Sequence, residues 1–500
     1  MQNVEQNGSP QPSASFLRAS TYSALPARLW SATAPTVFAA LAPVTLNFPL
    51  ARALGVSDST LVAPDTLAIL GGATPAPGLQ NIALAYAGHQ FGHFNPAMGD
   101  GRAVIIGQIR APDGTLYDAQ LKGSGATPYA RRGDGRASLS AMLREYIISE
   151  AMAGLKIPTT RSLAVVATGE TVQRDLSQPG AILTRIARSH VRVGTFQFAA
   201  NEDAKAGQGS DLLRSLTDQT IRRLAPEVLQ SPHPICAFFA KVIADQAALI
   251  AAWMGVGFIH GVMNTDNMSV AGESIDFGPC AFMDAFHPQK VFSSIDEQGR
   301  YAYNRQPQIA VWNLARLGES LLPLFDADQQ TAVVMAKAAL DRFGLAYGAA
   351  SRAIWSQKLG LPDTPENNPI IAATFALLTQ SGADFTLFFR RLTQIAGGAD
   401  PSAFLALFVD PAPARDYLES WRSVDGGARD GLATMRAKNP IYIPRNHRIE
   451  QALASAVAGD LSAFERLCAV LAHPFDEQGT DDLESPPLPE EVVTQTFCGT

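Results

Sequence analysis

The hydrophobic pattern of this chain changes once along its length, and that change restricts the fold to two unlike parts. Between about residues 100 and 200, stretches that alternate between apolar and polar residues are mixed with a helical stretch. After about residue 210 the pattern is mostly helical. Because alternation is typical of strands and a wider apolar spacing is typical of helices, the chain is expected to be an α+β protein. We expect a smaller α/β lobe followed by a larger, mostly helical lobe.

The smaller lobe contains a strong hairpin signal. Segments 103–110 and 115–122 have the residues of strands and flank a turn at 111–114 that ends in glycine. Glycine supplies the positive φ that tight hairpin turns need, so the two segments are predicted to pair. The other elements predicted here are a helix over 138–154 and strands over 162–168 and 181–187.

The composition of the chain and of its two ends predicts where the two lobes begin and end. The 500 residues are 47% hydrophobic and 17% charged, an ordinary globular composition with enough chain for more than one core. Both ends are polar and rich in Gly, Pro, Ser or acidic residues, as disordered tails are. The predicted order is a disordered tail over 1–15, an N-lobe over 16–205, a helical C-lobe over 206–476, and a flexible tail over 477–500 that ends in Cys-Gly-Thr.

The charge, the cysteines and the N-terminus narrow the surroundings of the protein. A net charge of −7 gives no global field that would attract nucleic acid or an anionic membrane. The four cysteines form no C-x-x-C pair, and residues 1–15 lack the basic start and apolar run of a signal peptide. The most apolar helical stretch, 235–253, contains Lys241 and Asp245 and is expected in a core. A cytoplasmic protein without membrane or nucleic-acid partners is therefore expected.

A glycine-rich turn precedes the first hairpin strand. Gly99 and Gly101 allow the backbone to approach a ligand closely, and Arg102 can pair with phosphate through two parallel hydrogen bonds. An ordinary surface turn explains the same residues equally well, so this turn by itself identifies no ligand.

A lysine and a glutamate in the smaller lobe are suited to holding phosphate. Alternation along 115–122 places Lys122 on the polar face of its strand. Glu145 follows within the predicted helix, and a strand lysine braced by a helix glutamate is how kinases hold a phosphate-binding ammonium. A solvated lysine is the alternative for Lys122, and Glu150 on the same helix competes for the role of Glu145.

Between this lysine and this glutamate lies a dense positive loop, 129–136, with three arginines around two glycines. In a net acidic protein we interpret the loop as a phosphate clamp, although a solvated surface loop has the same composition. Arg185, Arg188 and Arg192 follow a later strand and would add to the same pocket. Surface charges are the alternative for Arg185 and Arg188.

The most specific segment begins with the loop 260–267, which starts at a histidine. It continues through a predicted short hairpin to Asp-Phe-Gly at 276–278. This is the order of the catalytic loop and the metal-binding motif of kinases. Asp276 and Asn267 would then be hard oxygen ligands, which suit Mg²⁺ or Mn²⁺.

One position departs from the kinase order. Kinases carry the base aspartate two residues after the histidine, where this chain has Val262, which cannot take a proton. The nearest carboxylate is Asp266, directly before Asn267. The sequence therefore predicts that the base has moved or that the reaction differs.

Two histidines offer a competing metal site. His89 and His93 are four residues apart, a spacing compatible with zinc on a helix. Gln90 replaces the glutamate that a metalloprotease requires, and no third ligand is evident nearby. Gly92 and the Asn-Pro pair at 95–96 favour a loop instead of a helix.

Four stretches of the chain together resemble one family. They are AYAGHQFGHFNPAMGDGRA, LKGSGATPYARRGDGRA, FIHGVMNTDNMS with DFGPCAFMD, and IPRNHRIEQAL. They are similar to the SelO/YdiU family of kinase-fold protein nucleotidyltransferases, and the resemblance extends from about residue 25 to the C-terminus. It implies a protein-kinase-like bilobal fold that binds ATP in an orientation flipped relative to ordinary kinases. Members transfer AMP to Ser, Thr or Tyr hydroxyls of proteins, and some use UTP with Mn²⁺ and transfer UMP.

The resemblance also implies roles for single residues. Asp266 would be the proton acceptor, and Glu145 would brace Lys122. Asn267 and Asp276 would bind Mg²⁺ or Mn²⁺. The residues implied to contact the nucleotide are Gly99, Gly101, Arg102, Lys122, Asp134, Gly135, Arg185, Arg192 and Asp276.

The C-terminus resembles the ending of this family, where some members carry selenocysteine that bonds a cysteine beyond Asp-Phe-Gly. Here Cys498 occupies that place, but Cys280 follows Asp276 too closely to match the pattern. Packing is the favoured role for Cys280. The segment 444–447 is either structural or reaches the site.

Three functions remain open for a monomer of this kind. The first is a protein AMP-transferase that acts on protein substrates. The second is a phosphotransferase with Asp266 as a relocated base, and Val262 argues against it. The third is a nucleotide-binding pseudokinase scaffold, which would not need the metal pair Asn267 and Asp276.

Overall fold

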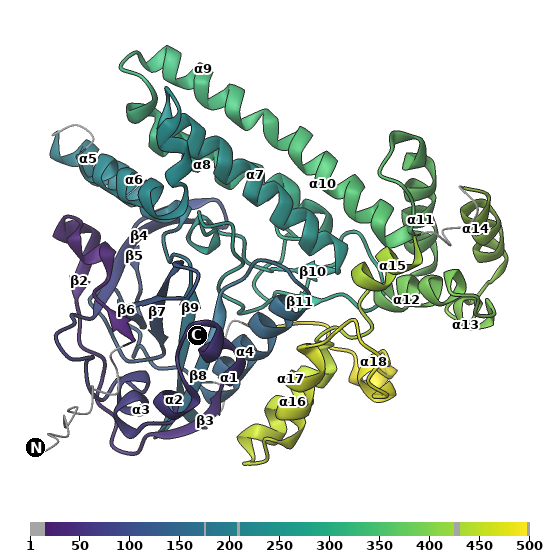
Figure 1. Cartoon of the computed structure of the whole chain (residues 1–500), viewed down its shortest axis with the longest axis horizontal. Coiled ribbons are helices and arrows are strands. Elements are labelled where there is room, and N and C mark those ends of the chain that lie inside the picture. The colour runs from purple at the N-terminus through teal and green to yellow at the C-terminus, as the bar shows by residue number, and fades with distance from the viewer. Residues whose placement is uncertain (1–15, 175–176, 208–210, 425–430, 498–500) are drawn as a thin grey trace, which may run out of the picture. The chain divides into compact units, whose positions relative to one another are not determined.

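The computed structural model describes residues 16–174, 177–207, 211–424 and 431–497 (Figure 1). Contacts divide the chain into two compact units. The first unit consists of Met1–Ala85, Gly99–Leu139 and Ser162–Arg188, and the second consists of Tyr86–Met98, Ser140–Arg161 and Ser189–Thr500. The N-terminal part is rich in sheet and the C-terminal part is helical, which confirms the α+β prediction. The lobe boundary near residue 205 stays a prediction, and the predicted tail over 1–15 lies outside the described residues.

One large sheet runs through the N-terminal half of the chain. Its main order is β2-β4-β6-β7-β9-β8-β3, with β1 beside β6 and β5 beside β4. The pairings whose register is known are antiparallel. The strands are β1 (Leu17–Arg18), β2 (Trp30–Ala32), β3 (Ala42–Leu46), β4 (Ile82–Gln90), β5 (His93–Gly99), β6 (Ala103–Arg110), β7 (Leu116–Lys122), β8 (Arg161–Gln173) and β9 (Ser177–Ala187).

The predicted hairpin is present as β6 and β7. Arg110 pairs with Leu116 next to the turn, and Gly114 in the turn has a φ of 87°. Ala119 and Leu121 of β7 point into the buried core of the first unit, which confirms the predicted alternation. Short helices contribute to the same core: α1 (Phe48–Ala53), α2 (Asp58–Leu61) and α3 (Pro64–Leu70).

Gly92 and the Asn-Pro pair at 95–96 were expected to lie in a loop instead of a helix; the segment is indeed not helical, but most of it is strand. His89 lies in β4, which ends at Gln90. A two-residue turn at 91–92 follows, and β5 begins at His93. Pro96 is tolerated inside β5 because, among the described residues, this strand pairs only with β4, so its other edge needs no amide donor. Glycine and proline usually mark longer loops, which is why the sequence pattern misled the prediction.

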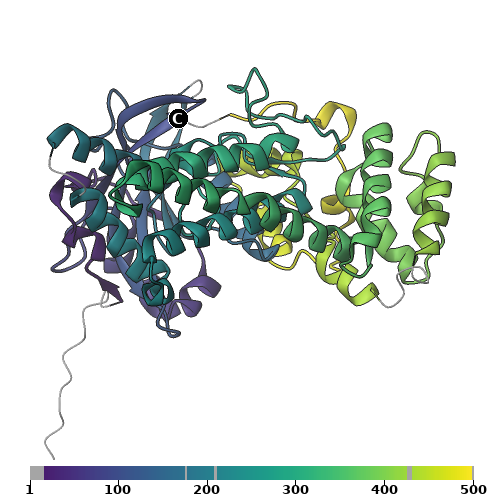
Figure 2. The same ribbon diagram turned by 90° about the horizontal axis from the view of Figure 1, so that it is seen from above.

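The second unit contains long helices that lie side by side. The predicted core helix 235–253 is present as α7 (Pro234–Gly255), and it packs against α8 (Gln306–Phe325) and α10 (Arg342–Leu359) in both views (Figure 1, Figure 2). Among the residues with described structure, α7 alone is long and apolar enough to cross a membrane. More than half of its most apolar stretch is buried inside the protein, as in a core helix.

Further helices complete the chain. They are α4 (Leu139–Gly154), α5 (Val193–Ala206), α6 (Asp211–Leu224), α9 (Gln329–Leu340), α11 (Asn368–Ser381), α12 (Phe385–Ala396), α13 (Ser402–Leu405), α14 (Ala412–Ser423), α15 (Leu432–Lys438), α16 (Asn446–Val457), α17 (Ser462–Leu471) and α18 (Asp481–Glu484). The predicted helix 138–154 is therefore present almost to the residue as α4, and the mostly helical pattern after residue 210 is confirmed.

The last part of the chain differs from the expected flexible tail. The Thr496 hydroxyl donates to the Pro279 carbonyl at 2.5 Å, and the Thr496 N–H donates to the Phe292 carbonyl at 2.8 Å. Its prolines and acidic residues made this segment resemble a disordered one. Hydrogen bonds to the backbone of distant residues hold it in place, and such bonds leave no apolar pattern in the sequence. Residues 498–500, which include the cysteine considered for a disulfide, lie outside the described residues.

Candidate active site

In the first unit, a buried carboxylate shapes the predicted glycine-rich turn. Asp100 is 3% exposed, and its Oδ2 accepts a hydrogen bond from Gln120 Nε2 at 3.0 Å. Gly99 has a φ of 151°, and a Cβ at this position would lie 2.4 Å from the Tyr129 ring. Packing inside the first unit therefore requires glycine at position 99, independently of any ligand.

The arginine-rich loop packs against this turn. The Gly125 N–H donates to the Gly135 carbonyl at 3.0 Å, and a Cβ on Gly135 would lie 2.1 Å from the Gly125 carbonyl carbon. The Thr127 hydroxyl donates to the Asp100 carbonyl at 2.6 Å. The two predicted nucleotide-binding loops are thus adjacent within the first unit.

Lys122 and Arg185 are buried on one face of the sheet. Arg185 on β9 is paired in register with Gln120 on β7, and its Nη1 lies 3.4 Å from Gln120 Oε1. Lys122 is two residues after Gln120, so it points to the same face. Arg185 is 1% exposed and Lys122 is 8% exposed, which excludes the alternatives of a surface charge and a solvated lysine.

The charges of the positive loop are partly balanced inside the first unit. Arg174 donates to both carboxylate oxygens of Asp134, at 2.9 and 3.0 Å, and this hydrogen bonding is the main cause that lowers the pKa of Asp134. Arg136 forms an ion pair with Glu170 at 2.6 Å. The other two arginines of the loop are exposed. They are the loop cations that remain most accessible to a phosphate.

In the second unit, two short strands frame the predicted catalytic loop 260–267. β10 (Phe258–Ile259) enters the loop and pairs antiparallel with β11 (Ala281–Phe282), which follows Asp-Phe-Gly. His260 Nε2 donates to the Ile275 carbonyl at 2.9 Å, and His260 Nδ1 accepts from the Val262 N–H at 3.4 Å. Burial lowers the pKa of His260, so the neutral ring joins the loop to the predicted metal-binding motif.

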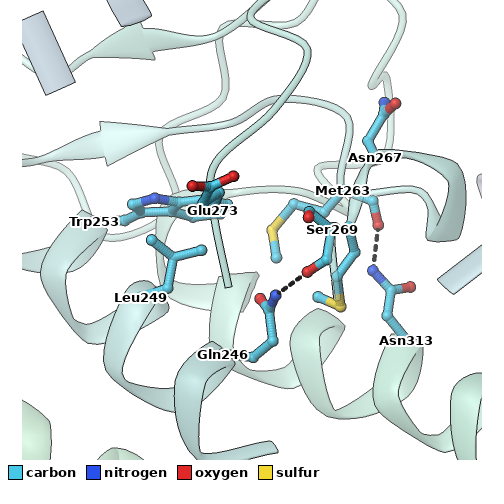
Figure 3. A pocket seen from close by; sticks show the side chains of 9 residues that line it. Gln246, Leu249, Trp253, Met263, Asn267, Ser269, Glu273 and Asn313 are labelled. Atoms are coloured by element: carbon cyan, nitrogen blue, oxygen red, sulfur yellow. Dashed lines mark hydrogen bonds between the residues drawn. The ribbon is translucent and has the colours of Figure 1, made fainter. Parts of the chain in front are cut away.

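Two long helices support the predicted catalytic loop and the residues directly after it (Figure 3). Asn313 of α8 donates to the Met263 carbonyl at 2.9 Å, and Gln246 of α7 donates to the Ser269 carbonyl at 2.7 Å. Asn267 lines the same small pocket as these side chains. Buried amide-to-carbonyl bonds of this kind hold the loop backbone rigidly.

The short hairpin predicted between the catalytic loop and Asp-Phe-Gly is not formed. A turn is present at 271–272, but the residues before and after it form β-bridges with other segments of the chain instead of with each other. Ser269 bridges Arg192, and Ser274 bridges Thr159. Tertiary pairing replaced local pairing here, and it places Arg192 beside the catalytic loop.

Asp266 lies in the short helical turn Thr265–Asn267 and is 6% exposed. Burial raises the pKa of its carboxyl to about 6, while the charge of Arg192 opposes that rise. Among described residues, its Oδ1 has no hydrogen-bond partner, and a Cβ on Gly88 would lie 2.5 Å from this atom. A buried carboxylate with an unused acceptor atom is suited to take a proton from a hydroxyl.

Asp276 adopts a backbone conformation that is uncommon for residues other than glycine, with a φ of 64°. Its Oδ2 accepts a hydrogen bond from Arg192 Nη1 at 2.5 Å, and the same nitrogen donates to the Asp266 carbonyl oxygen at 2.6 Å. The Arg192 guanidinium lies over the Tyr86 ring, 5.0 Å from its centre. One arginine therefore joins the predicted base to the predicted metal ligand.

Asn267 and Asp276 fit a hard divalent cation by the chemistry of their atoms. The Asn267 amide nitrogen donates to the Val262 carbonyl at 2.9 Å, which leaves the amide oxygen for a ligand. Within the described ranges, no group of three His, Cys, Asp or Glu side chains forms a metal site. Mg²⁺ that acts with nucleotides takes one or two carboxylates from the protein and fills its shell with phosphates and water. The donor set suits such a cation.

The predicted pair of Lys122 and Glu145 stays a prediction, because the two residues belong to different units. Glu145 is 3% exposed on α4. Its competitor Glu150 accepts two hydrogen bonds from Arg161, at 2.6 and 2.9 Å, within the second unit. These bonds account for the charge of Glu150 without a role in phosphate binding.

Sequence reasoning missed Arg144, the residue before Glu145. Arg144 Nε donates to the Gly278 carbonyl at 3.2 Å, and its Nη2 donates to the Cys280 carbonyl at 2.8 Å. Its Nη1 is paired with Glu450 at 2.8 Å. Arg144 thus holds the backbone on both sides of Pro279 through hydrogen bonds. No local sequence pattern around Arg144 predicts this role. Cys280 is fully buried, as its expected packing role requires.

The segment 444–447, left open between two roles, has a structural one. Arg445 is 1% exposed, and its Nη1 pairs with Asp284 at 2.5 Å and with Asp384 at 2.8 Å. Asn446 Nδ2 donates to a carbonyl of β11 at 2.8 Å. The segment braces the residues that follow Asp-Phe-Gly.

Known proteins share nearly the whole of this chain. The sequence profile of the family described as protein adenylyltransferase SelO matches residues 19–472. The protein nucleotidyltransferase YdiU of Bradyrhizobium sp. strain BTAi1 is 51% identical over 488 residues, which cover 96% of this chain and 98% of that relative. The protein of the same name from Rhizobium etli strain CFN 42 is 50% identical over 504 residues, which cover 98% of each chain.

Proposed function

The chain belongs to the protein adenylyltransferase SelO family, and we propose that it transfers AMP from ATP to Ser, Thr or Tyr hydroxyls of target proteins. In this reaction the hydroxyl oxygen bonds to the α-phosphorus, and the bond from that phosphorus to the bridging oxygen breaks. The proton of the hydroxyl passes to the protein, and pyrophosphate leaves. The nucleotide would bind with its α-phosphate toward the metal ligands.

The observation that carries this proposal is the position of the carboxylate in the predicted catalytic loop, which is absent where kinases have their base and present four residues later. Val262 occupies the place of the kinase base and cannot accept a proton. Asp266 is buried, its pKa is raised to about 6, and one carboxylate oxygen has no hydrogen-bond partner in the described part of the chain. We assign the proton of the acceptor hydroxyl to this oxygen.

Asn267 and Asp276 would bind Mg²⁺ or Mn²⁺ through oxygen atoms. The ion, when bound, stabilises negative charge on the phosphate oxygens and on the leaving pyrophosphate. Arg192 orients the Asp276 carboxylate and the Asp266 backbone with one nitrogen. The same guanidinium is proposed to contact the nucleotide.

The first unit would bind the phosphates, as the N-lobe of a protein-kinase-like bilobal fold. Its support is the buried cationic face of the sheet and the adjacent glycine-rich loops. Glu145 is proposed to brace Lys122. The proposed nucleotide contacts of this unit are Gly99, Gly101, Arg102, Lys122, Asp134, Gly135 and Arg185.

The setting of the reaction is part of the same proposal. A cytoplasmic monomer would act on proteins and would need neither nucleic acid nor membrane. UTP is a second proposed donor, which would give UMP transfer.

The test uses ATP labelled at either the α or the γ phosphate, with Mg²⁺ and the purified protein. Label on protein from α-labelled ATP alone supports AMP transfer. Label from γ-labelled ATP alone would make the protein a kinase with Asp266 as a displaced base. No label from either, with a thermal shift by ATP, would leave a nucleotide-binding scaffold.

The matched control is Asp276→Asn. Asparagine tolerates the positive φ of this position better than alanine does, so the variant removes the charge with little backbone strain. The label from α-labelled ATP should disappear while the unfolding temperature stays close to that of the wild type. Persistent label in this variant would exclude Asp276 as a required metal ligand.

A further inference from the structure

A surface of the second unit combines arginines with aromatic rings. The Arg300 guanidinium lies 4.9 Å from the centre of the Trp312 ring, and that of Arg316 lies 5.1 Å from the same centre. The His89 ring packs edge-on against the Trp312 ring, with 5.1 Å between the ring centres, and its centre lies 4.8 Å from that of the Phe94 ring. We call the surface of these five residues the Arg-Trp patch.

The Arg-Trp patch is bonded directly to the catalytic loop. The hydroxyl of Tyr301, the residue that follows Arg300 of the patch, donates to Asn264 Oδ1 at 2.6 Å. The His89 N–H donates to the Thr265 hydroxyl at 2.7 Å. The two acceptor residues are the pair directly before Asp266, so a chain that contacts the patch lies close to the proposed base.

The charge of the patch is only partly balanced by carboxylates. In the part of the chain that the structure describes, no Asp or Glu forms an ion pair with Arg300, and its Nε has no hydrogen-bond partner. Asp296 is near but accepts instead from the backbone N–H groups of Arg300 and Tyr301, both at 2.8 Å. Arg316 has one carboxylate partner, Glu319, at 2.6 Å.

The patch is also accessible. Phe94 is 43% exposed, while Arg300, Trp312 and Arg316 are half-buried. Burial is the main cause that lowers the pKa of His89, and the charges of Arg316 and Arg300 create a positive local field that lowers this pKa further. This field is unusual in a protein whose net charge is −7.

We propose that the Arg-Trp patch binds an acidic stretch of the acceptor protein and so brings a neighbouring hydroxyl to Asp266. This substrate class rests on the proposed transfer to proteins. Guanidinium groups that lie flat on an aromatic ring keep their N–H edges available, and those edges match carboxylates. A local positive patch on an acidic protein also discriminates, because a basic segment gains nothing there and an acidic one is attracted.

Binding is measured first, without catalysis. A fluorescein-labelled peptide with one serine between glutamates is titrated with the full chain, beside the same peptide with glutamines. The acidic peptide should bind about tenfold more tightly, and Arg300→Gln should abolish that difference. Arg342→Gln, at an exposed position of α10, removes an equal charge elsewhere and should leave both affinities unchanged. Equal binding of the acidic peptide by wild type and Arg300→Gln would overturn the proposal.

Transfer kinetics then separate the patch from the reaction. Arg300→Gln should raise the KM for the acidic peptide about tenfold while kcat and the KM for ATP stay unchanged. A raised KM for ATP would assign the patch to the nucleotide and overturn the proposal. If no variant labels any peptide, the proposed function fails, whereas the binding result still decides the patch. Arg316→Gln serves as the second variant if Arg300→Gln unfolds at a lower temperature.

Discussion

Arg192 and Asp276 form an ion pair with an N–O distance of 2.5 Å, and their side chains are only 5% and 19% exposed. Arg192 immediately precedes α5, so the positive end of that helix lies beside the pair. The pair orients a carboxylate whose backbone has the uncommon φ of 64°. A metal ion bound by Asp276 would therefore meet a side chain that is already fixed.

Replacing Arg192 with lysine should lower kcat/KM for AMP transfer about 100-fold, because the lysine side chain is too short to reach the position of Arg192 Nη1, the one nitrogen that donates to both Asp276 and the Asp266 carbonyl. Charge is conserved, so the unfolding temperature should change little. The rate is measured with α-labelled ATP. Wild-type rates in Arg192→Lys would show that the guanidinium geometry is dispensable.

Arg144→Met should weaken Mn²⁺ binding about tenfold, since the variant releases the carbonyls of Gly278 and Cys280 and loosens the position of Asp276. Paramagnetic resonance titration with Mn²⁺ measures this affinity without turnover. Glu450→Gln is the matched control, because Glu450 contacts Arg144 from an exposed position and leaves both carbonyl bonds intact. Equal Mn²⁺ affinity in Arg144→Met and Glu450→Gln would contradict the positioning role of Arg144.

Gly88→Ala should reduce AMP transfer by about 100-fold, because the added methyl would lie 2.5 Å from Asp266 Oδ1 and must displace the proposed base. Gly344→Ala in α10 adds the same methyl where nothing lies within 4 Å, so it should retain full activity. Both variants are compared in initial rates and in circular dichroism. An active, folded Gly88→Ala would mean that Asp266 tolerates displacement.

Lys358→Met should stabilise the protein, and the gain should depend on pH. Lys358 is 2% exposed, and burial lowers its pKa from 10.5 to about 7, although its ammonium lies 4.2 Å from the centre of the Phe389 ring. Between pH 7 and 10.5 the unfolded chain binds this proton and the folded chain releases it, so the wild type gains stability as pH rises. Below pH 7 the buried charge carries its full cost.

The expected gain of Lys358→Met is therefore about 1–3 kcal/mol at pH 6 and shrinks toward pH 10. Urea unfolding at the two pH values measures it. Lys337→Met, at an exposed site on α9, should show no such dependence. A gain that is equal at pH 6 and pH 10 would argue against a buried, easily deprotonated lysine.

Local patterns predicted local elements well. The hairpin β6–β7 and helices α4 and α7 were expected nearly at their observed bounds, because alternation, helical spacing and a turn glycine act within a few residues. The strands β4 and β5 were missed, because their two-residue turn and an edge-strand proline imitate a loop. The prediction of a short hairpin before Asp276 was wrong because residues far away in the chain form the β-bridges that the two hairpin strands would have formed with each other.

The sequence by itself determined which residues are the candidates for the chemistry: the order of His260, Asp266, Asn267 and Asp276 along the covalent chain is enough to predict the motif and its missing base at Val262. Only the tertiary structure decided how these groups are charged and oriented. Arg192, Arg144 and Arg445 contact partners far away in the chain, and no local pattern encodes those pairings. Burial, which raises the pKa of Asp266 to about 6, is likewise a property of the packed protein, because desolvation depends on every neighbour that excludes water.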